Sequence, residues 1–93
     1  MIRCVVQVSF TPNLGVHVDV TPLDVQGTTV REALEAVFEV RPRMRSYVLD
    51  DQGRLRAHVN VFVSGQMIRD RDQQTDAVDT STSLWVFQAL SGG

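Results

Sequence analysis

The stretch Leu84-Trp85-Val86-Phe87-Gln88-Ala89-Leu90-Ser91-Gly92-Gly93 stands at the end of the 93-residue sequence. Its first four residues alternate between aliphatic and aromatic side chains, which predicts a β-strand, because successive side chains of a strand point to opposite faces. We expect Leu84 and Val86 to face the core. Trp85 and Phe87 then point to the other side of the sheet.

The residues after this strand are small, and the last two are glycines. Because Gly92 and Gly93 have no side chains, this end of the backbone fits a channel too narrow for any other residue. Its one distinctive group is the carboxylate of Gly93, which such a tail suits for presentation to another protein's active site. A frayed terminus that contains glycine by chance is the alternative. We predict a domain over residues 1–89 and a flexible tail over residues 90–93, Leu90-Ser91-Gly92-Gly93.

Alternating apolar residues predict several further strands. The first covers residues 2–10, and its apolar face consists of Ile2, Cys4, Val6, Val8 and Phe10. A turn over residues 11–15 and a second alternating stretch over residues 16–21 predict a hairpin. A strand over residues 58–64 has Val59, Val61 and Val63 on one face and Asn60 and Phe62 on the other. A short strand follows at Met67 and Ile68.

The apolar period changes from two to 3.6 in the middle of the chain, which predicts a helix. Its apolar stripe consists of Val30, Ala33, Leu34, Val37 and Phe38. Thr29 and Glu32 have the spacing of a capping box, in which each side chain accepts a hydrogen bond from an amide at the helix start. Pro42 ends this helix near Val40. A further helical turn is expected over residues 43–50, with Met44, Tyr47, Val48 and Leu49 as its apolar members.

The order of these elements is a hairpin, a main helix, a short helix, a strand, a short strand and a final strand. A helix between the second and third strands suits a mixed sheet with the helix packed across one face. The first and last strands are short and rich in apolar residues, which favours the centre of the sheet. The predicted fold class is therefore α+β, a β-grasp arrangement with a mixed sheet of about five strands and one main helix packed across it.

The composition limits the possible functions. The chain is 43% hydrophobic and has a net charge of -2, which fits one small globular domain. We expect no nucleic-acid partner, because a clustered basic face is missing, and no membrane partner, because there is no apolar run long enough for a membrane helix. The single cysteine, Cys4, excludes an internal disulfide, and the cytoplasm is the expected location. All nine basic residues are arginines, so the chain has no lysine amine.

No metal site is expected. His17 and His58 lie on predicted strands without a companion at ligand spacing. The acidic residues between positions 70 and 79 lack the central glycine and the closing glutamate of a calcium loop. The arginine-rich residues 41–45 are either a solvated corner of the domain or a contact for an acidic partner.

Four segments carry a resemblance to a known family. They are residues 29–35 (Thr-Val-Arg-Glu-Ala-Leu-Glu), residues 47–55 (Tyr-Val-Leu-Asp-Asp-Gln-Gly-Arg-Leu), residues 58–65 (His-Val-Asn-Val-Phe-Val-Ser-Gly) and the terminal Gly92-Gly93. In these segments, and in their order, the chain resembles the small sulfur-carrier proteins of the MoaD/ThiS type, which include the small subunit of molybdopterin synthase. The resemblance implies a ubiquitin-like β-grasp fold and a carrier protein rather than an enzyme.

The resemblance also implies that the carboxylate of Gly93 is the working group. A ubiquitin-activating-type adenylyltransferase uses ATP to adenylate it. The product is then converted to a thiocarboxylate that donates sulfur in cofactor or metabolite biosynthesis, with molybdopterin favoured. The implied partners are this adenylyltransferase and a sulfurtransferase or synthase large subunit, and the chain itself binds no cofactor. A ubiquitin-like modifier conjugated through Gly93 and a non-covalent interaction module are the alternatives.

The aromatic side of the last strand is the expected partner-binding surface. Family members dock their enzymes through an apolar sheet face beside the tail, and Trp85, Phe87 and Phe62 have the corresponding positions here. Leu90 is expected to join the contacts of the tail. Residues 69–79, which are polar and loop-like, could instead fold over the aromatic rings, and the sequence leaves both interpretations open.

Overall fold

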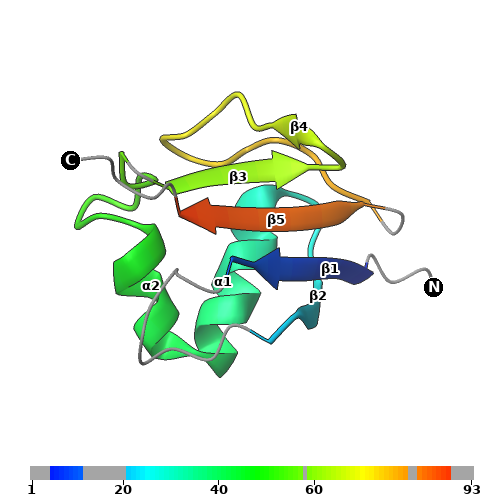
Figure 1. The fold of residues 1–93 in the computed structure, drawn as a ribbon, viewed down its shortest axis with the longest axis horizontal. Helices are drawn as coiled ribbons and strands as arrows, with labels where there is room; N and C mark the ends of the chain where they lie inside the picture. The colour runs from blue at the N-terminus through cyan, green and yellow to red at the C-terminus, as the bar shows by residue number, and fades with distance from the viewer. Residues whose placement is uncertain (1–4, 12–20, 58, 80–81, 89–93) are drawn as a thin grey trace.

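The computed structural model describes residues 5–11, 21–57, 59–79 and 82–88. They form a five-stranded sheet and two helices (Figure 1). The elements, in chain order, are β1 (Val5–Phe10), β2 (Leu23–Gln26), α1 (Val30–Val40), α2 (Pro42–Val48), β3 (Val59–Val63), β4 (Gln66–Met67) and β5 (Ser83–Gln88).

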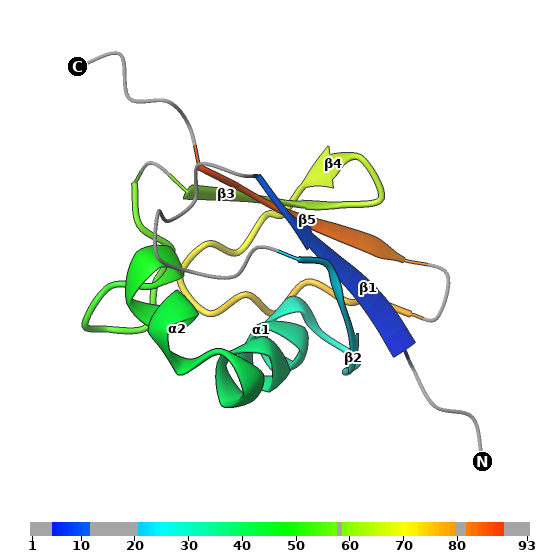
Figure 2. The ribbon, with the colours of Figure 1, turned by 60° about the horizontal axis from the view of Figure 1, so that its bottom comes forward.

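The sheet has the strand order β2-β1-β5-β3-β4, with β5 at its centre (Figure 1). Strands β1 and β5 run parallel, and the other neighbouring pairs are antiparallel. Both helices lie on one side of the sheet (Figure 2). The predicted α+β class is confirmed, with a mixed five-stranded sheet and the first and last strands in its middle.

The composition of β5 suits the central position. Leu84 and Val86 are fully buried on the helix side, as predicted, and the alternate residues point to the opposite side. At the level of Val86, the strand pairs with Phe10 of β1 on one edge and with Val61 of β3 on the other. A central strand needs an apolar core side and hydrogen-bonding partners along both edges. Strand β5 has both.

One hydrophobic core fills the space between the sheet and the helices. Helix α1 contributes the predicted stripe, Val30, Ala33, Leu34, Val37 and Phe38, and all five are buried. Helix α2 contributes Met44 and Val48, and Leu49 follows them into the core. The expectation for Tyr47 is wrong, because its side chain is 37% exposed. Met44 and Val48, four residues apart, define the buried side of this short helix, and Tyr47 lies beside it.

The start of α1 shows a displaced form of the predicted capping box. The Thr29 hydroxyl accepts a hydrogen bond from the Glu32 amide at 3.2 Å, as expected. The Glu32 carboxylate reaches one residue further back than expected and accepts from the amide and the hydroxyl of Thr28, at 2.8 and 2.9 Å. These two hydrogen bonds, the amide first, hold the pKa of Glu32 below its ordinary value.

The junction between the two helices is as predicted. Helix α1 ends at Val40, and the Arg41 amide donates to the carbonyl of Val37 at 2.8 Å. Pro42 is the first residue of α2, a position where its missing amide costs nothing. The proline therefore ends one helix and begins the next.

The partner strand of β1 lies later in the chain than predicted. Strand β2 pairs antiparallel with β1, from Val5 opposite Gln26 to Val8 opposite Leu23. The expected second strand, residues 16–21, falls almost wholly outside the described residues, as do Ile2 and Cys4. The antiparallel pairing next to β1 is therefore observed with Leu23–Gln26. The sequence analysis missed this strand because its single buried residue, Val25, produces no alternating pattern.

Residues 69–79 run along the helix side of the sheet, where Figure 2 shows them in yellow to orange. The Val30 amide donates to the carbonyl of Asp76 at 2.9 Å, and the Val78 amide donates to the carbonyl of Thr28 at 3.0 Å. Val78 is buried, whereas Ala77 is exposed. The segment thus joins the start of α1 to the sheet.

Replacing Leu34 with alanine tests the assignment of the core. Leu34 is fully buried in α1, so Leu34→Ala should lower the free energy of unfolding by about 2–5 kcal/mol. Urea unfolding followed by circular dichroism measures the loss. Val40→Ala is the matched control on the same helix, because Val40 is 63% exposed, and it should change the stability by no more than about 0.5 kcal/mol. Equal losses in the two variants would contradict this packing.

Candidate functional site

The four residues of the predicted tail, Leu90, Ser91, Gly92 and Gly93, lie outside the described residues. The described chain ends at Gln88, the last residue of β5, which pairs with Val59 at the beginning of β3. In the sequence, the predicted tail begins two residues after Gln88.

An aromatic cluster covers β5 and β3 on the face opposite the helices. Trp85 and Phe87 are 41% and 37% exposed, and Phe62 is partly buried. The rings of Phe62 and Phe87 meet edge to face with centroids 5.1 Å apart, and the ring centroid of Trp85 lies 5.7 Å from that of Phe87. Such ring pairs contribute about 0.5–1.5 kcal/mol beyond their burial. The structure thus brings the three predicted partner-binding residues together in one exposed cluster.

Met67 extends this cluster across the sheet. The cross-strand register places Trp85 opposite Phe62 and Phe62 opposite Met67. Paired residues of neighbouring strands point to the same side, so Met67, which is 51% exposed, continues the apolar surface. We call Phe62, Met67, Trp85 and Phe87 the open face. The sequence analysis missed Met67 because its neighbours depend on the register between β3 and β4.

No described element covers the open face. Both helices and residues 69–79 lie on the other side of the sheet (Figure 2). The interpretation in which residues 69–79 fold over Trp85 and Phe87 is therefore wrong. Backbone hydrogen bonds hold this segment elsewhere, since the Arg31 amide donates to the carbonyl of Gln74 at 2.9 Å. Contiguous exposed apolar surface of this kind marks interaction sites.

A cation borders the open face at the beginning of β3. Arg71 donates from Nη1 to Oδ1 of Asn60 at 2.8 Å, and from Nη2 to the carbonyl oxygens of Arg56 and Val59, both at 2.7 Å. Asn60 lies directly opposite Phe87 in the sheet. The guanidinium therefore caps the outer edge of β3 next to the aromatic cluster.

A buried glutamine fixes the segment that carries Arg71. Gln74 is fully buried, and both ends of its amide are satisfied. Arg31 Nη1 donates to its Oε1 at 3.1 Å, and its Nε2 donates to the carbonyls of Arg71 and Gly53 at 2.7 and 3.3 Å. A buried amide costs stability unless it is bonded, so these contacts specify one position for the segment. No pattern in the sequence distinguishes Gln74 from Gln73 beside it.

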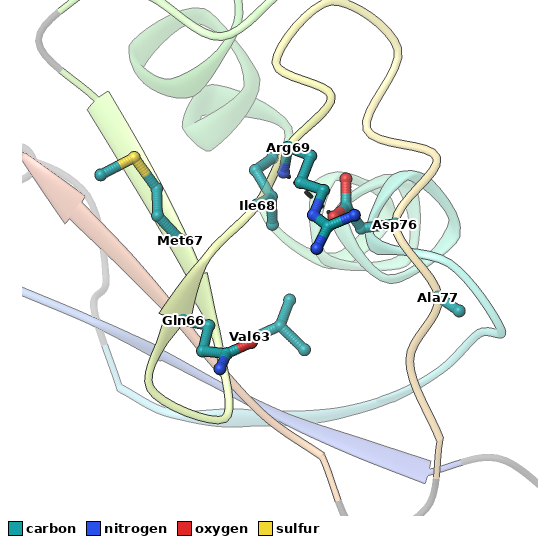
Figure 3. Close-up of a pocket in the computed structure, with 7 residues that line it drawn as sticks. All are labelled: Val63, Gln66, Met67, Ile68, Arg69, Asp76 and Ala77. Atoms are coloured by element: carbon teal, nitrogen blue, oxygen red, sulfur yellow. Dashed lines mark hydrogen bonds between the residues drawn. The ribbon is translucent and has the colours of Figure 1, made fainter.

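A hollow of about 300 Å³ lies at the other end of β3, away from Gln88 (Figure 3). Its lining consists of Val63, Gln66, Met67, Ile68, Arg69, Asp76 and Ala77. The Asp76 carboxylate accepts hydrogen bonds from the amides of Arg69 and Asp70, both at 3.0 Å, so it stabilises the loop between residues 69 and 76. The Met67 side chain points away from Arg69 and Asp76. Apart from Met67, no residue of this lining belongs to the open face, and the hollow lies at the end of β3 away from Gln88.

The other candidate residues have structural contacts or lie outside the described residues. In the arginine-rich stretch, Arg45 pairs with Glu35 at 2.6 Å, and Arg41 donates to the carbonyl of Thr21 at 2.6 Å. These contacts favour the interpretation of residues 41–45 as a corner of the domain over a contact for an acidic partner. His17, His58 and Cys4 are among the residues that the structure does not describe. In the described ranges, no three His, Cys, Asp or Glu side chains are grouped as metal ligands.

Two carboxylates stabilise loops beside the site. The Asp70 carboxylate accepts from the Thr75 hydroxyl at 2.7 Å and from the Gln73 amide at 3.0 Å, and these hydrogen bonds lower its pKa. The Asp50 carboxylate accepts from the amides of Arg54 and Gln52, and the Arg54 amide is the main cause of its lowered pKa. Both groups are therefore ionised loop caps.

No protein-family model and no curated protein matches the sequence. Solved structures do match. Small archaeal modifier protein 1 (SAMP1) from Haloferax volcanii superposes with a TM-score of 0.81 at 25% identity, over 96% of this chain and 99% of that one. SAMP1 from Methanosarcina acetivorans gives a TM-score of 0.77 at 17% identity, over the full length of both. A chain of the BexX/CysO complex from Amycolatopsis orientalis gives 0.78 at 22% identity, over 95% and 99%.

The fold is the ubiquitin-like β-grasp. Each similar structure is covered almost completely, so the likeness extends to the whole domain. The resemblance to small MoaD/ThiS-type proteins, inferred from four sequence segments, is thereby confirmed. Neither helix of the described part is long and apolar enough to span a membrane.

The lowered pKa of Asp70 leads to a prediction about acid stability. A carboxyl with a lowered pKa in the folded state stabilises the fold above the ordinary pKa of about 4, and this contribution is lost as the pH falls through the folded-state value. Asp70→Asn should therefore be less stable than the native chain at pH 7, and the gap should shrink below about pH 4. Thermal unfolding at several pH values measures it.

Asp72→Asn is the control for this series. It removes the same charge two residues away, from an exposed side chain. It should leave the stability at pH 7 nearly unchanged. A gap for Asp70→Asn that stayed constant down to pH 2 would show that the carboxylate charge plays no part.

Proposed function

We propose that this chain is a cytoplasmic sulfur-carrier protein. A ubiquitin-activating-type enzyme uses ATP to adenylate the Gly93 carboxylate. A sulfurtransferase then converts the acyl-adenylate to a thiocarboxylate, and a synthase uses the sulfur, with a molybdopterin-type acceptor favoured. The observation that carries the proposal is a diglycine that follows shortly, in the sequence, after the central strand of a β-grasp sheet, and this strand has exposed aromatic residues on its outer side.

The proposed chemistry explains why the reacting group is the free carboxylate of Gly93. A carboxylate oxygen is a poor leaving group, so the carbonyl carbon resists attack by a sulfur nucleophile. Adenylation joins that oxygen to AMP and releases pyrophosphate, and the sulfur nucleophile then displaces AMP. The carrier's part is to place its last carbonyl in the enzyme's pocket, for which Gly92 and Gly93 offer the thinnest possible backbone.

The similar structures support a role as substrate and subunit. SAMP1 is by name a small modifier protein, and CysO occurs in a complex with BexX. We infer a comparable role here, in which enzymes grip the domain and act on its end. The chain itself is then not the enzyme.

The length of the tail limits how the partner binds. Five residues follow Gln88, and they reach at most about 18 Å at 3.3–3.6 Å per residue. The partner must therefore hold the domain close to its nucleotide pocket. The open face suits this purpose because Trp85 and Phe87 belong to the strand that leads into the tail.

Deleting Gly93 tests the proposed function. The truncated chain should lose adenylation, measured as ATP–pyrophosphate exchange with the activating enzyme of the same cells. Its thermal unfolding should not change, because the deletion lies beyond the sheet. A truncated chain that was still adenylated would exclude the proposal.

Replacing Trp85 with alanine tests the open face. Trp85→Ala should weaken binding to the activating enzyme at least fivefold, about 1 kcal/mol, and should destabilise the domain less, because the ring is 41% exposed. Isothermal titration calorimetry and urea unfolding measure the two effects. Val5→Ala is the matched control, since Val5 is equally exposed on β1, away from the cluster. A large loss of stability with unchanged binding would assign the ring to the core instead.

The name of SAMP1 keeps a second function under consideration, a modifier joined through Gly93 to amines of other proteins. The chain has no lysine, so its own side chains offer no amine for such a bond. The intact mass of protein from its native cells separates the possibilities. Exchange of one oxygen for sulfur indicates the carrier, and protein-sized adducts indicate the modifier. An unmodified chain alone would indicate the non-covalent interaction module.

A further inference from the structure

We propose that Arg71 is the docking point for a carboxylate of the activating partner. This inference rests on the proposed function and adds the chemistry of the partner surface to it. The partner surface is expected to place apolar side chains on the open face and one acidic side chain against the guanidinium at its margin.

The position of Arg71 is the first observation. Its Nη2 donates to the carbonyl of Val59, and Val59 pairs with Gln88, the last residue of β5. Its Nη1 donates to Asn60, which lies opposite Phe87 of the aromatic cluster. The guanidinium therefore lies where the open face meets the end of β5.

The charge of Arg71 is the second observation. The three oxygens that it contacts belong to two peptide carbonyls and one amide, and all are neutral. Other arginines of the described ranges, Arg45 and Arg54, pair with carboxylates. The three hydrogen bonds use three of the five N–H donors of a guanidinium, which leaves the Nε hydrogen and one Nη1 hydrogen for a ligand. A partly buried cation with neutral neighbours and spare donors suits an incoming carboxylate.

The fixed geometry of Arg71 is the third observation. Its backbone carbonyl accepts from buried Gln74 at 2.7 Å and from the Leu55 amide at 3.0 Å, so the main chain is held as firmly as the side chain. A side chain that is already ordered loses little conformational entropy when a partner binds. Arginine next to exposed aromatic rings is also the composition typical of interface hot spots.

A second copy of this chain is the competing occupant of the open face. Asp24 of β2 lies opposite exposed Gln7 of β1, so its side chain points to the side of the sheet that carries the open face. It lies at the edge of the sheet far from Arg71. Two copies packed face to face could pair these residues. Under the proposed function the enzyme must bind near the end of β5, and Arg71 lies at that end of the sheet, which favours the enzyme.

The experiment compares Arg71→Gln and Arg71→Lys in ATP–pyrophosphate exchange with the activating enzyme of the same cells, at a temperature where both variants are folded. Urea unfolding of both variants accompanies the exchange assay, because a purely structural role of Arg71 would lower stability and exchange together, whereas a docking role raises the KM of variants that remain folded. We expect Arg71→Gln to raise the KM for the carrier roughly five- to thirtyfold with little change in kcat. The KM of this variant should also increase less with NaCl concentration than the KM of the native chain does. Arg71→Lys should stay within about threefold of the native KM.

Arg69→Gln is the matched control, because it removes the same charge from an exposed side chain at the hollow near β4. It should leave KM nearly native. Equal effects of the two Arg71 variants, a native KM for Arg71→Gln, or an equal effect of Arg69→Gln would each overturn the inference. A native dimer in sedimentation that Arg71→Gln dissociates would assign the face to a second copy and overturn it as well. Exchange that persists without Gly93 would instead reject the proposed function.

Discussion

The domain depends on the position of β5 between β1 and β3. This strand forms hydrogen bonds along both edges, packs Leu84 and Val86 into the core, and turns Trp85 and Phe87 outward. A strand held on three sides offers a rigid base for whatever follows it. The same strand thus supplies the centre of the core, the aromatic surface and the starting point of the tail. This arrangement joins stability and the proposed function in six residues.

A second constraint comes from the polar contacts on the helix side of the sheet. Residues 69–79 have few apolar side chains, yet they are held in place because Gln74 bonds to Arg31, Gly53 and the backbone of Arg71. Each of these groups would be costly to bury alone, so the set favours one arrangement. This arrangement of residues 69–79 leaves the open face uncovered and places the guanidinium of Arg71 at its margin. The surface properties of one side of the sheet therefore depend on hydrogen bonds on the other.

Much of the fold could be predicted because its patterns are local. The 3.6-residue stripe of α1, the proline at its end and the alternation in β1, β3 and β5 each follow from neighbouring residues. The aromatic cluster was also predictable, because strand alternation alone assigns Phe62 and Phe87 to the same kind of position. Strand β2 was missed because it has one buried residue, and Tyr47 was misplaced because a seven-residue helix buries only a narrow side.

The amino-acid order was sufficient for the strand and helix types, for the side of each strand that is apolar, and for the small residues at the chain's end, since these depend on backbone periodicity and side-chain size. It was not sufficient for Arg71, Gln74 or Met67. Their roles come from contacts between residues 11 to 43 positions apart, or from the register of two strands. Such contacts exist only after the sheet has assembled, because hydrogen bonds and shared burial, not local pattern, select the partners.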